Sequence, residues 1–364
     1  MMGRPVVSVV VIARNEERHI GRALESALEA SARLEAEVIF VDSASTDATA
    51  EVAGRYPVRL LRLEPGWFLS PAAGRHVGLA AASGEFVFFL DGDSELEAGF
   101  LEAALPVLAA GPAVAAVLGK RREVVRTPEG RSRVVEEDAY AVTAVRHWLP
   151  GHNIGGSGLY RRRALQEVGG FNPWLCSWEE AELGARLFDA GHHILFIPQP
   201  MITHLDHHPL DVGELARRWR EKLLLGRGQV LRLYPFRRAP YQGLSRILGM
   251  MGLWALLPPL AAAAAILGQP WVLAAWPLSM LALFAAFALR AGGLRKPAFY
   301  FLFWTLSAVK LIQGFLMAPR DPADYPLPAG LSPETHHGEA HERPADNHRL
   351  LADRQAGQGC AAGP

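Results

Sequence analysis

The sequence predicts an α/β protein with a doubly wound sheet, followed by apolar C-terminal helices long enough to cross a membrane. Three observations support this fold class. About the first hundred residues alternate β-branched runs with helical segments, polar residues follow several of those runs, and residues 247–289 contain no Asp, Glu, Lys or Arg. Because 20% of the whole chain is charged, a charge-free stretch of that length marks a second part with its own composition.

Composition narrows the possible functions and the compartment. The 37 basic and 37 acidic residues cancel to a formal net charge of +0, so the whole chain offers no electrostatic argument for nucleic-acid binding. The two cysteines, Cys176 and Cys360, provide neither a disulfide framework nor a thiolate metal site, as expected in a reducing compartment. The N-terminus shows no secretory signal pattern. We therefore expect the N-terminal part to lie in the cytosol.

Strands and helices are predicted to alternate in the N-terminal part. Strands are expected over Val6–Ile12, Glu37–Asp42, Val58–Leu63 and Glu85–Leu90, and helices over Ser45–Gly54 and Ala72–Ala82. Asn15 is expected to cap the helix after the first strand, and Ser45 or Thr46 the next helix. In such a sheet, ligands collect at the carboxyl ends of the strands.

The next hundred or so residues are predicted to complete this domain, which covers residues 1–215. A Pro-Gly turn after Thr127 predicts a hairpin between Lys120–Arg126 and Arg131–Glu137. Helices are expected over Tyr140–Trp148 and Glu179–Ala190, and a strand over His193–Ile197.

A basic segment and an apolar region follow. Residues 216–246 carry nine Lys or Arg among aromatic side chains, which favours an amphipathic segment on an anionic membrane surface over a solvated basic helix. The candidate spans in residues 247–318 are Ile247–Gly268, Trp271–Leu289 and Ala298–Ala318. Because the first contains two prolines and the third contains Lys310, the prediction is two or three transmembrane helices.

Charges around these spans predict their orientation. The basic segment and the loop with Arg290, Arg295 and Lys296 favour the cytoplasmic side. Three spans would then place the C-terminus on the opposite side from the N-terminal domain. Residues 319–364 are rich in Pro, His, Gly and Glu, and we expect them to form a disordered tail.

Carboxylates end two of the predicted inner strands. Asp91 and Asp93 flank a glycine, and such a pair can hold a hard divalent cation together with the oxygens of a diphosphate, although a simple turn explains most Asp-Gly pairs. Asp42 ends another strand, where it could accept a hydrogen bond from a nucleobase or ribose. Together with residues 13–16 after the first strand, these groups are expected to meet at one edge of the sheet.

Several segments of the sequence, taken in their order along the chain, resemble those of the family 2 glycosyltransferases. The first three are VSVVVIARNEE, VDSASTDAT and AAGRHVGLAAASGEFVFFLDGDSEL. Further matches are GGSGLYRR at 155–162, GGFN at 169–172, WEEAEL at 178–183 and ITH at 202–204. The resemblance implies a GT-A fold, which is a Rossmann-like mixed sheet that binds a nucleotide-sugar.

The resemblance also implies ligand-binding roles. Asp42 would contact the base, Asp91 would lie near the ribose and diphosphate, and Asp93 would ligate the metal. Mn²⁺ or Mg²⁺ is the implied cofactor, with Asp91 and His204 as further ligands. The implied nucleotide site comprises Ala13, Asn15, Glu16, Asp42, Ser43, Arg75 and Asp91. The implied acceptor side comprises Gly156, Ser157, Trp178, Arg218 and Trp219.

The implied reaction is an in-line displacement that inverts the anomeric carbon. Glu180 stands where the family usually has an Asp that deprotonates the acceptor hydroxyl, and Glu179 is the alternative base. Residues 215–219 are similar to the Gln-x-x-Arg-Trp segment of processive polysaccharide synthases, but Leu215 replaces the Gln. Transfer of a single sugar is therefore favoured over polymerisation.

Together these features predict an enzyme of the cytoplasmic membrane whose catalytic domain faces the cytoplasm. It would move a sugar from a nucleotide-diphospho-sugar to a lipid-linked or glycan acceptor near the membrane, in cell-envelope glycan or glycolipid synthesis, with no nucleic-acid partner. A nucleotidyltransferase is one alternative, although no glycine-rich, lysine-bearing phosphate loop follows the first strand. A non-catalytic membrane scaffold is another, and the intact Asp91, Asp93 and Glu180 argue against it.

Overall fold

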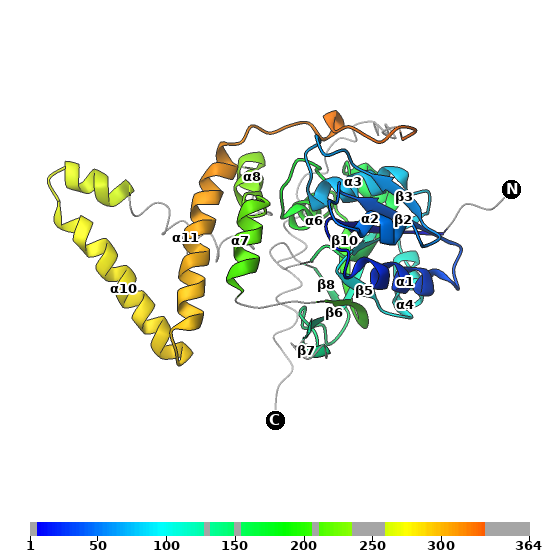
Figure 1. The fold of residues 1–364 in the computed structure, drawn as a ribbon, viewed down its shortest axis with the longest axis horizontal. Coiled ribbons are helices and arrows are strands. Elements are labelled where there is room, and N and C mark those ends of the chain that lie inside the picture. The colour runs from blue at the N-terminus through cyan, green and yellow to red at the C-terminus, as the bar shows by residue number, and fades with distance from the viewer. Residues whose placement is uncertain (1–5, 127–131, 149–153, 206–210, 235–258, 332–364) are drawn as a thin grey trace, which may run out of the picture. The chain divides into compact units, whose positions relative to one another are not determined.

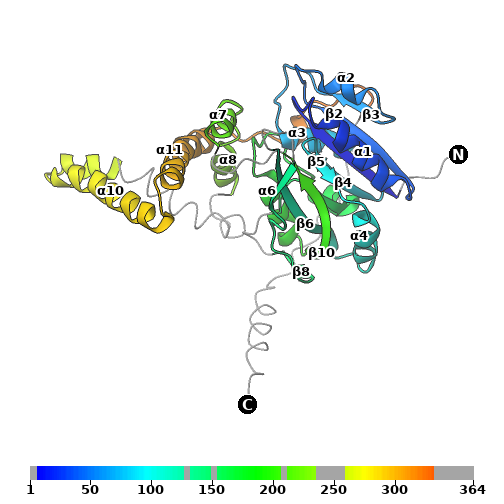
Figure 2. The same cartoon turned by 60° about the horizontal axis from the view of Figure 1, so that its bottom comes forward.

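One mixed sheet organises the N-terminal part of the chain. The computed structural model describes residues 6–126, 132–148, 154–205, 211–234 and 259–331. The strand order is β3-β2-β1-β4-β9-β6-β10-β5, with β7 paired to β6 and β8 to β10 (Figures 1 and 2). The strands are β1 Val7–Ala13, β2 Ala36–Asp42, β3 Arg59–Arg62, β4 Phe86–Asp91, β5 Ser94–Leu96, β6 Val114–Arg126, β7 Ser132–Glu136, β8 Arg146–His147, β9 Gly158–Arg161 and β10 His193–His204.

The order of the strands creates a ligand-binding edge. β1 pairs in parallel with β2 on one side and with β4 on the other, so the direction of winding reverses between β1 and β4. Every residue of β1 is buried, as its unbroken β-branched run predicts for a strand covered on both faces. β9 runs antiparallel to β4 and β6, which makes the sheet mixed. The predicted α/β class is confirmed, and ligands are expected outside the carboxyl ends of β1 and β4.

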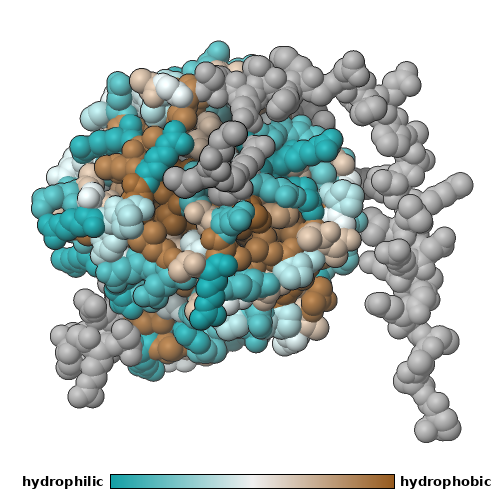
Figure 3. All heavy atoms as spheres, turned by 90° about the vertical axis from the view of Figure 1, so that its right-hand side faces the viewer, coloured by the Kyte–Doolittle hydropathy of each residue, from teal (hydrophilic) through white to brown (hydrophobic). Residues whose placement is uncertain are grey.

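Helices pack on this sheet and complete the core. α1 and α3 lie against β1 and β2, whereas α4 and α6 lie against β10. These helices and the short α2 and α5 are α1 Ile20–Ser31, α2 Thr49–Ala53, α3 Pro71–Ala81, α4 Phe100–Ala109, α5 Arg162–Glu167 and α6 Glu179–Asp189. The face of the molecule seen in Figure 3 carries many hydrophilic side chains around a central group of apolar ones.

Both predicted helix caps are wrong. α1 begins only at Ile20, and Asn15 instead lies in the left-handed region (φ 58°), where its Oδ1 accepts from Thr46 N. α2 begins at Thr49, whose N–H donates to Asp47 Oδ1. Asn15 therefore bonds to the loop after β2, and Asp47, not Ser45 or Thr46, accepts at the start of α2.

The helix predicted over Tyr140–Trp148 is also wrong. The Asp138 carboxylate accepts hydrogen bonds from the backbone N–H groups of Tyr140 and Val142, which competes with helical hydrogen bonding. The last part of this segment forms β8 instead. The predicted hairpin is confirmed by the antiparallel pairing of β6 and β7. The last strand is longer than predicted, because β10 continues through Pro198 and Pro200 with shifts of register, the kind of irregularity at which a strand tolerates proline.

The part of the chain after the sheet is mainly helical where the structure describes it. The helix α7 (Val212–Arg220) straddles the predicted domain boundary at residue 215, so the predicted basic segment contains only its second half, together with α8 (Gly226–Leu233). α10 (Trp271–Ala291) and α11 (Arg295–Leu316) are long and apolar enough to cross a membrane. Of the first candidate span, residues 259–266 are helical and residues 247–258 lie outside the described residues.

The two long helices differ in their surroundings. α10 exposes apolar side chains such as Leu278 and Leu281. α11 packs beside α8, and in Figures 1 and 2 it runs next to α7 and α8. Lys310 of α11 lies over the Trp219 ring of α7, 4.1 Å from its centroid, so this lysine faces a partner helix. Within the described residues, α10 thus leaves most of its apolar surface exposed and packs on α11 through aromatic pairs such as Phe284 with Phe301.

After α11 the chain returns to the α/β domain. Tyr325 is buried beside Trp67 and Trp174, and its hydroxyl donates to Phe68 O at 2.8 Å. The prediction of disorder from residue 319 is therefore wrong for residues 319–331, where aromatic contacts and a short 3₁₀ turn (Pro322–Asp324) hold the chain. The prediction that three complete spans place this segment on the opposite side is wrong for the same reason, because one domain cannot lie on both sides of a bilayer.

Candidate active site

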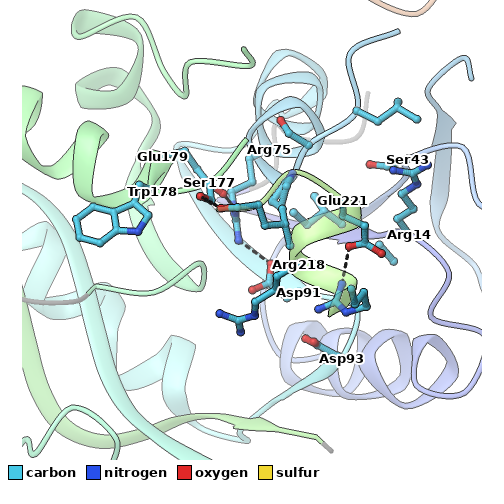
Figure 4. Close-up of a pocket in the computed structure, with 18 of the residues that line it drawn as sticks. Arg14, Ser43, Arg75, Asp91, Asp93, Ser177, Trp178, Glu179, Arg218 and Glu221 are labelled. Atoms are coloured by element: carbon cyan, nitrogen blue, oxygen red, sulfur yellow. Dashed lines mark hydrogen bonds and ion pairs between the residues drawn. The ribbon is translucent and has the colours of Figure 1, made fainter. Parts of the chain in front are cut away.

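The ends of three neighbouring strands form one side of a cavity. The register pairs Ala13 with Asp42 and Ile12 with Asp91, so the ends of β2, β1 and β4 lie side by side. A cavity of about 390 Å³ opens at this edge (Figure 4). The sequence-predicted residues that line it are Ala13, Glu16, Ser43, Arg75, Asp91, Asp93, Trp178, Glu179, Glu180 and Arg218.

A buried arginine links two elements of the cavity. Arg75 of α3 is 1% exposed, and its Nη2 donates to Asp91 Oδ1 at 2.6 Å, while its Nη1 donates to Glu179 Oε1 at 2.5 Å. Figure 4 shows the guanidinium reaching toward Asp91. Burial opposes the charge, but the surrounding carboxylates raise the pKa of Arg75 above its ordinary value, so the group stays a cation.

A glycine behind this pair allows the close approach. A Cβ at Gly156 would lie 1.9 Å from Arg75 Nη2 and 2.6 Å from Asp91 Oδ2. Only a glycine leaves room for the guanidinium and the carboxylate at this distance. Gly156 therefore shapes the floor behind the cavity, and the neighbouring Ser157 is buried beside it.

The two candidate bases differ in accessibility. Both begin α6, where carboxylates complement the helix dipole. Glu179 is 2% exposed and bound to Arg75, and burial together with the neighbouring Glu180 raises its pKa to about 8. The Glu180 side chain is 21% exposed and its Oε1 lies 3.7 Å from Arg75 Nη1. Glu180 is thus the carboxylate that a ligand in the cavity can reach more easily.

Asp93 and His204 form a second charged group. His204 Nε2 lies 3.2 Å from Asp93 Oδ2, and His204 Nδ1 lies 2.6 Å from Glu123 Oε2. Burial alone would lower the pKa of His204, but the hydrogen bonds to both carboxylates raise it to about 9. Burial would likewise raise the pKa of Asp93, yet His204 lowers it overall. The contacts to Asp93 and Glu123 thus favour the imidazolium form of His204, which lies between the two carboxylates.

The donor set suits a hard divalent cation that completes its coordination from a ligand. Across the residues that the structure describes, no three His, Cys, Asp or Glu side chains converge as a ready-made metal site. Asp91 and Asp93 instead offer two carboxylates at the cavity, flanking Gly92. Burial and the nearby Asp93 raise the pKa of Glu16 to about 8, a sign of concentrated negative charge. Such a set fits Mg²⁺ or Mn²⁺ bound together with phosphate oxygens.

Three non-glycine residues in or beside the segments that form the cavity have strained backbone conformations. Asn15, Ala44 and Trp178 all have φ values between 55° and 67° although none is glycine. Residues in this region cost free energy and tend to persist at functional sites. Asn15 N also donates to Ser45 Oγ, which ties the loop after β1 to the loop after β2. This arrangement holds Ala13 and Ser43 at the rim.

Some predicted residues do not line the cavity. Asp42 is fully buried, bound to Arg62 Nε at 3.0 Å and to the N–H of Ser45. His204 contacts Asp93, and Trp219 faces Lys310. The predicted residues outside the cavity lining are Asn15, Asp42, Gly156, Ser157, His204 and Trp219.

Other residues that line the cavity were not predicted from the sequence. Arg227 comes from α8 and Phe303 from α11, far along the chain from the strand ends. No motif marks either residue, and only the count of basic residues in the segment after residue 216 hinted at Arg227. The apolar helix α11 therefore supplies part of the wall of the cavity.

Comparisons with known proteins agree with this geometry. Residues 8–169 match the sequence profile of Glycosyl transferase family 2. A pre-mycofactocin glycosyltransferase of Mycobacterium tuberculosis is 31% identical over 146 residues, which are 38% of this chain and 30% of that protein's length. An uncharacterized glycosyltransferase of Mycobacterium bovis is 31% identical over 170 residues, which cover 46% of this chain and 73% of that protein.

A solved structure supports the fold. A mannosyltransferase from Pyrobaculum calidifontis, in complex with GDP-Man and Mn²⁺, superposes with a TM-score of 0.50 at 24% identity, over 86% of each chain. The mixed α/β sheet is thus that of the GT-A fold. With the family profile over β1 to β9 and a relative of 31% identity matched over most of its length, this chain belongs to glycosyltransferase family 2.

Proposed function

We propose that this protein is an inverting glycosyltransferase that moves a sugar from a nucleotide-diphospho-sugar to a hydroxyl of a lipid-linked or membrane-proximal acceptor. One observation carries the proposal. A single cavity combines the carboxylates Asp91, Asp93 and Glu180 with Phe303, a side chain of the apolar helix α11. The carboxylates proposed to act on the donor and a side chain of the helix proposed to meet the lipid thus line the same cavity.

The donor is proposed to lie at the strand ends. Ser43 and Glu16 line this end of the cavity, and the buried Asp42 orders the loop that carries Ser43. A divalent cation held by Asp91, Asp93 and the diphosphate would neutralise the charge that develops on the leaving nucleotide. The mannosyltransferase of Pyrobaculum calidifontis was solved with a nucleotide-sugar and Mn²⁺, which supports these two ligand classes.

Glu180 is proposed as the base. Its side chain is more exposed to the cavity than that of Glu179, whose carboxylate is held by Arg75. Glu180 would take the proton from the acceptor hydroxyl as the oxygen attacks the anomeric carbon and the nucleotide diphosphate leaves from the opposite face. Trp178 and Arg218 line the same cavity and are proposed to contact the acceptor.

The membrane arrangement is proposed from the return of residues 319–331 to the α/β domain. Between residues 234 and 319 the chain must cross a bilayer an even number of times. The candidate span that the sequence alone predicts over residues 247–268, together with α10, would make two crossings, joined by the uncharged loop at Gln269. α11 would then lie along the cytoplasmic surface, where Arg290, Arg295 and Lys296 agree with the preference of basic residues for that side.

Transfer can be tested with the purified full-length chain. The protein, Mn²⁺, a panel of nucleotide-sugars and a total lipid extract are incubated, and the lipids are analysed by mass spectrometry. We expect one donor to give lipids shifted by one sugar mass, and Glu180→Gln to abolish that product while metal-dependent nucleotide binding persists. Glu29→Gln, on the exposed face of α1, is the matched control. Transfer by Glu180→Gln at the native rate would refute the assigned base, and no sugar-shifted lipid with any donor would refute the lipid acceptor.

A further inference from the structure

Among the described residues that line the cavity, one partly buried cation, Arg227, has no carboxylate partner. Arg75 pairs with Asp91 and Glu179, as described above, and Arg14 is exposed to solvent. Arg217 pairs with Glu214 and Glu221, and Arg218 pairs with Glu214. Among the described residues, no ion pair involves Arg227, and its buried Nε has no hydrogen-bond partner.

Arg227 is held by two aromatic rings. Its Cζ lies 4.8 Å from the centroid of the Trp178 ring and 5.8 Å from that of Phe303. Trp178 immediately precedes the candidate bases on α6, whereas Phe303 belongs to the apolar helix α11. The guanidinium is therefore fixed between the catalytic end of the cavity and the helix that would meet the lipid.

A cation in this position is costly without a partner. Cation–π contacts offset only part of the loss of hydration. Burial, together with the nearby Arg218, lowers the pKa of Arg227 to about 10, whereas neighbouring carboxylates raise the pKa of Arg75. Arg227 thus sits in a cavity where an added anion would relieve an unfavourable charge.

The charges of the cavity are divided between its walls. Most carboxylates that line the cavity lie at the strand ends and at the start of α6, where the donor and its cation are proposed to bind, and the remaining one, Glu221 after α7, pairs with Arg217. Arg218 and Arg227 come from α7 and α8, and the adjoining Phe303 from α11. A guanidinium with free donors is well suited to phosphate oxygens. Resting on the proposed function, we propose that Arg227 binds a phosphate group of the lipid-linked acceptor.

The test is a set of binding measurements on the full-length chain in detergent. Isothermal titration gives the Kd of farnesyl phosphate, of farnesol, and of UDP and GDP with Mn²⁺. For Arg227→Gln we expect the Kd of farnesyl phosphate to rise roughly tenfold or more, as for a lost charge-assisted hydrogen bond. The Kd of the nucleotides should change by less than about threefold, and farnesol should bind as it does to the unchanged protein.

Two further variants separate a binding role from a structural one. Arg232→Gln removes the same charge from α8 at a residue that lies over Phe315, outside this cavity, and should leave all four Kd values unchanged. Arg227→Lys keeps the charge and should retain part of the affinity for farnesyl phosphate. The midpoint of thermal unfolding of Arg227→Gln should stay equal or rise, because an uncompensated charge is removed.

Each contrary result has a distinct meaning. An equal Kd for farnesyl phosphate in both proteins, or a wild-type chain that binds nucleotide but not farnesyl phosphate, overturns this inference and leaves the proposed function standing. A nucleotide Kd that rises as much as that of farnesyl phosphate assigns Arg227 to the donor and overturns it as well. A lowered unfolding midpoint with loss of all ligands shows a structural role. Farnesyl phosphate binding through Arg227 without any sugar transfer contradicts only the proposed function.

Discussion

Arg75 donates a 2.5 Å hydrogen bond to Glu179, a residue 104 positions later in the sequence. The other terminal nitrogen of the same guanidinium bonds to Asp91 at the end of β4. One buried cation therefore fixes the distance between the strand ends and the start of α6. This link makes a single site from elements that belong to separate motifs.

Replacing this cation should cost much of the stability of the domain. Arg75→Gln would leave both Asp91 and the buried Glu179 without the cation that they share, and we expect the free energy of unfolding to fall by about 3–5 kcal/mol. Urea denaturation of the full-length chain measures this change. The control is Arg55→Gln, which breaks an exposed pair with Glu51 and should cost less than about 1 kcal/mol. Similar losses in both variants would show that the buried pair has no special role.

Gly156 is expected to be intolerant of even a methyl group. Gly156→Ala places a Cβ within 1.9 Å of the Arg75 guanidinium, which must then move away from Asp91. We expect the Kd of the nucleotide with Mn²⁺ to rise at least about tenfold, measured by titration calorimetry. Gly111→Ala is the control, because nothing lies within 4 Å of a Cβ there. An unchanged Kd in Gly156→Ala would mean that the Arg75–Asp91 contact does not shape the nucleotide site.

Local patterns predicted the sheet and its ligand-binding edge, and long-range contacts account for what they missed. The runs that became β1, β2 and β4 are visible because a buried parallel strand is continuously apolar. The carboxylates after them were found because each follows its own strand. Arg227 and Phe303 could not be found in this way, since the packing of α8 and α11 brings them to the cavity from distant segments.

The wrong predictions also have a common physical cause, which is a contact made by a single side chain. The helix over residues 140–148 failed because the Asp138 side chain captures two backbone N–H groups. The disordered tail failed because Tyr325 finds an aromatic pocket built by Trp67, His76 and Trp174. Composition alone reports the average character of such a segment and not the partner that a single residue meets.

Acid should destabilise the sheet through Glu37. Burial raises the pKa of this carboxyl, but hydrogen bonds from Ser8 and Ser83 outweigh burial and lower the pKa below its ordinary value of 4.5. A lowered folded-state pKa contributes stability that is present above pH 4.5 and is lost as the pH falls through the folded-state pKa. The free energy of unfolding, measured by denaturation at several pH values across this range, should fall less steeply with decreasing pH in Glu37→Gln than in the unchanged protein. Glu35→Gln, at an exposed neighbour, should keep the native slope, and identical slopes in both variants would rule Glu37 out.

The proposed membrane arrangement predicts which loops are accessible from each side. In a Cys360→Ser background, in which the remaining Cys176 is buried, single cysteines replace Gln269 and Gly293. With α11 on the cytoplasmic surface, an impermeant maleimide should label Gly293→Cys only in inside-out vesicles and Gln269→Cys only in right-side-out vesicles. Labelling of Gly293→Cys from outside would instead mean that α11 crosses the bilayer.

The contact between α8 and α11 should control use of the lipid acceptor but not of the donor. A Cβ at Gly314 would lie 2.2 Å from the carbonyl oxygen of Leu225, so Gly314→Leu must push α11 away from α8 and withdraw Phe303 from the cavity. We expect sugar transfer to lipid to fall at least about tenfold, while the Kd of the nucleotide changes little because the strand ends are untouched. Gly293→Leu, where a Cβ meets nothing within 4 Å, is the matched control and should transfer sugar normally. If Gly314→Leu instead loses nucleotide binding together with transfer, α11 supports the whole domain, and its role in presenting the acceptor is refuted.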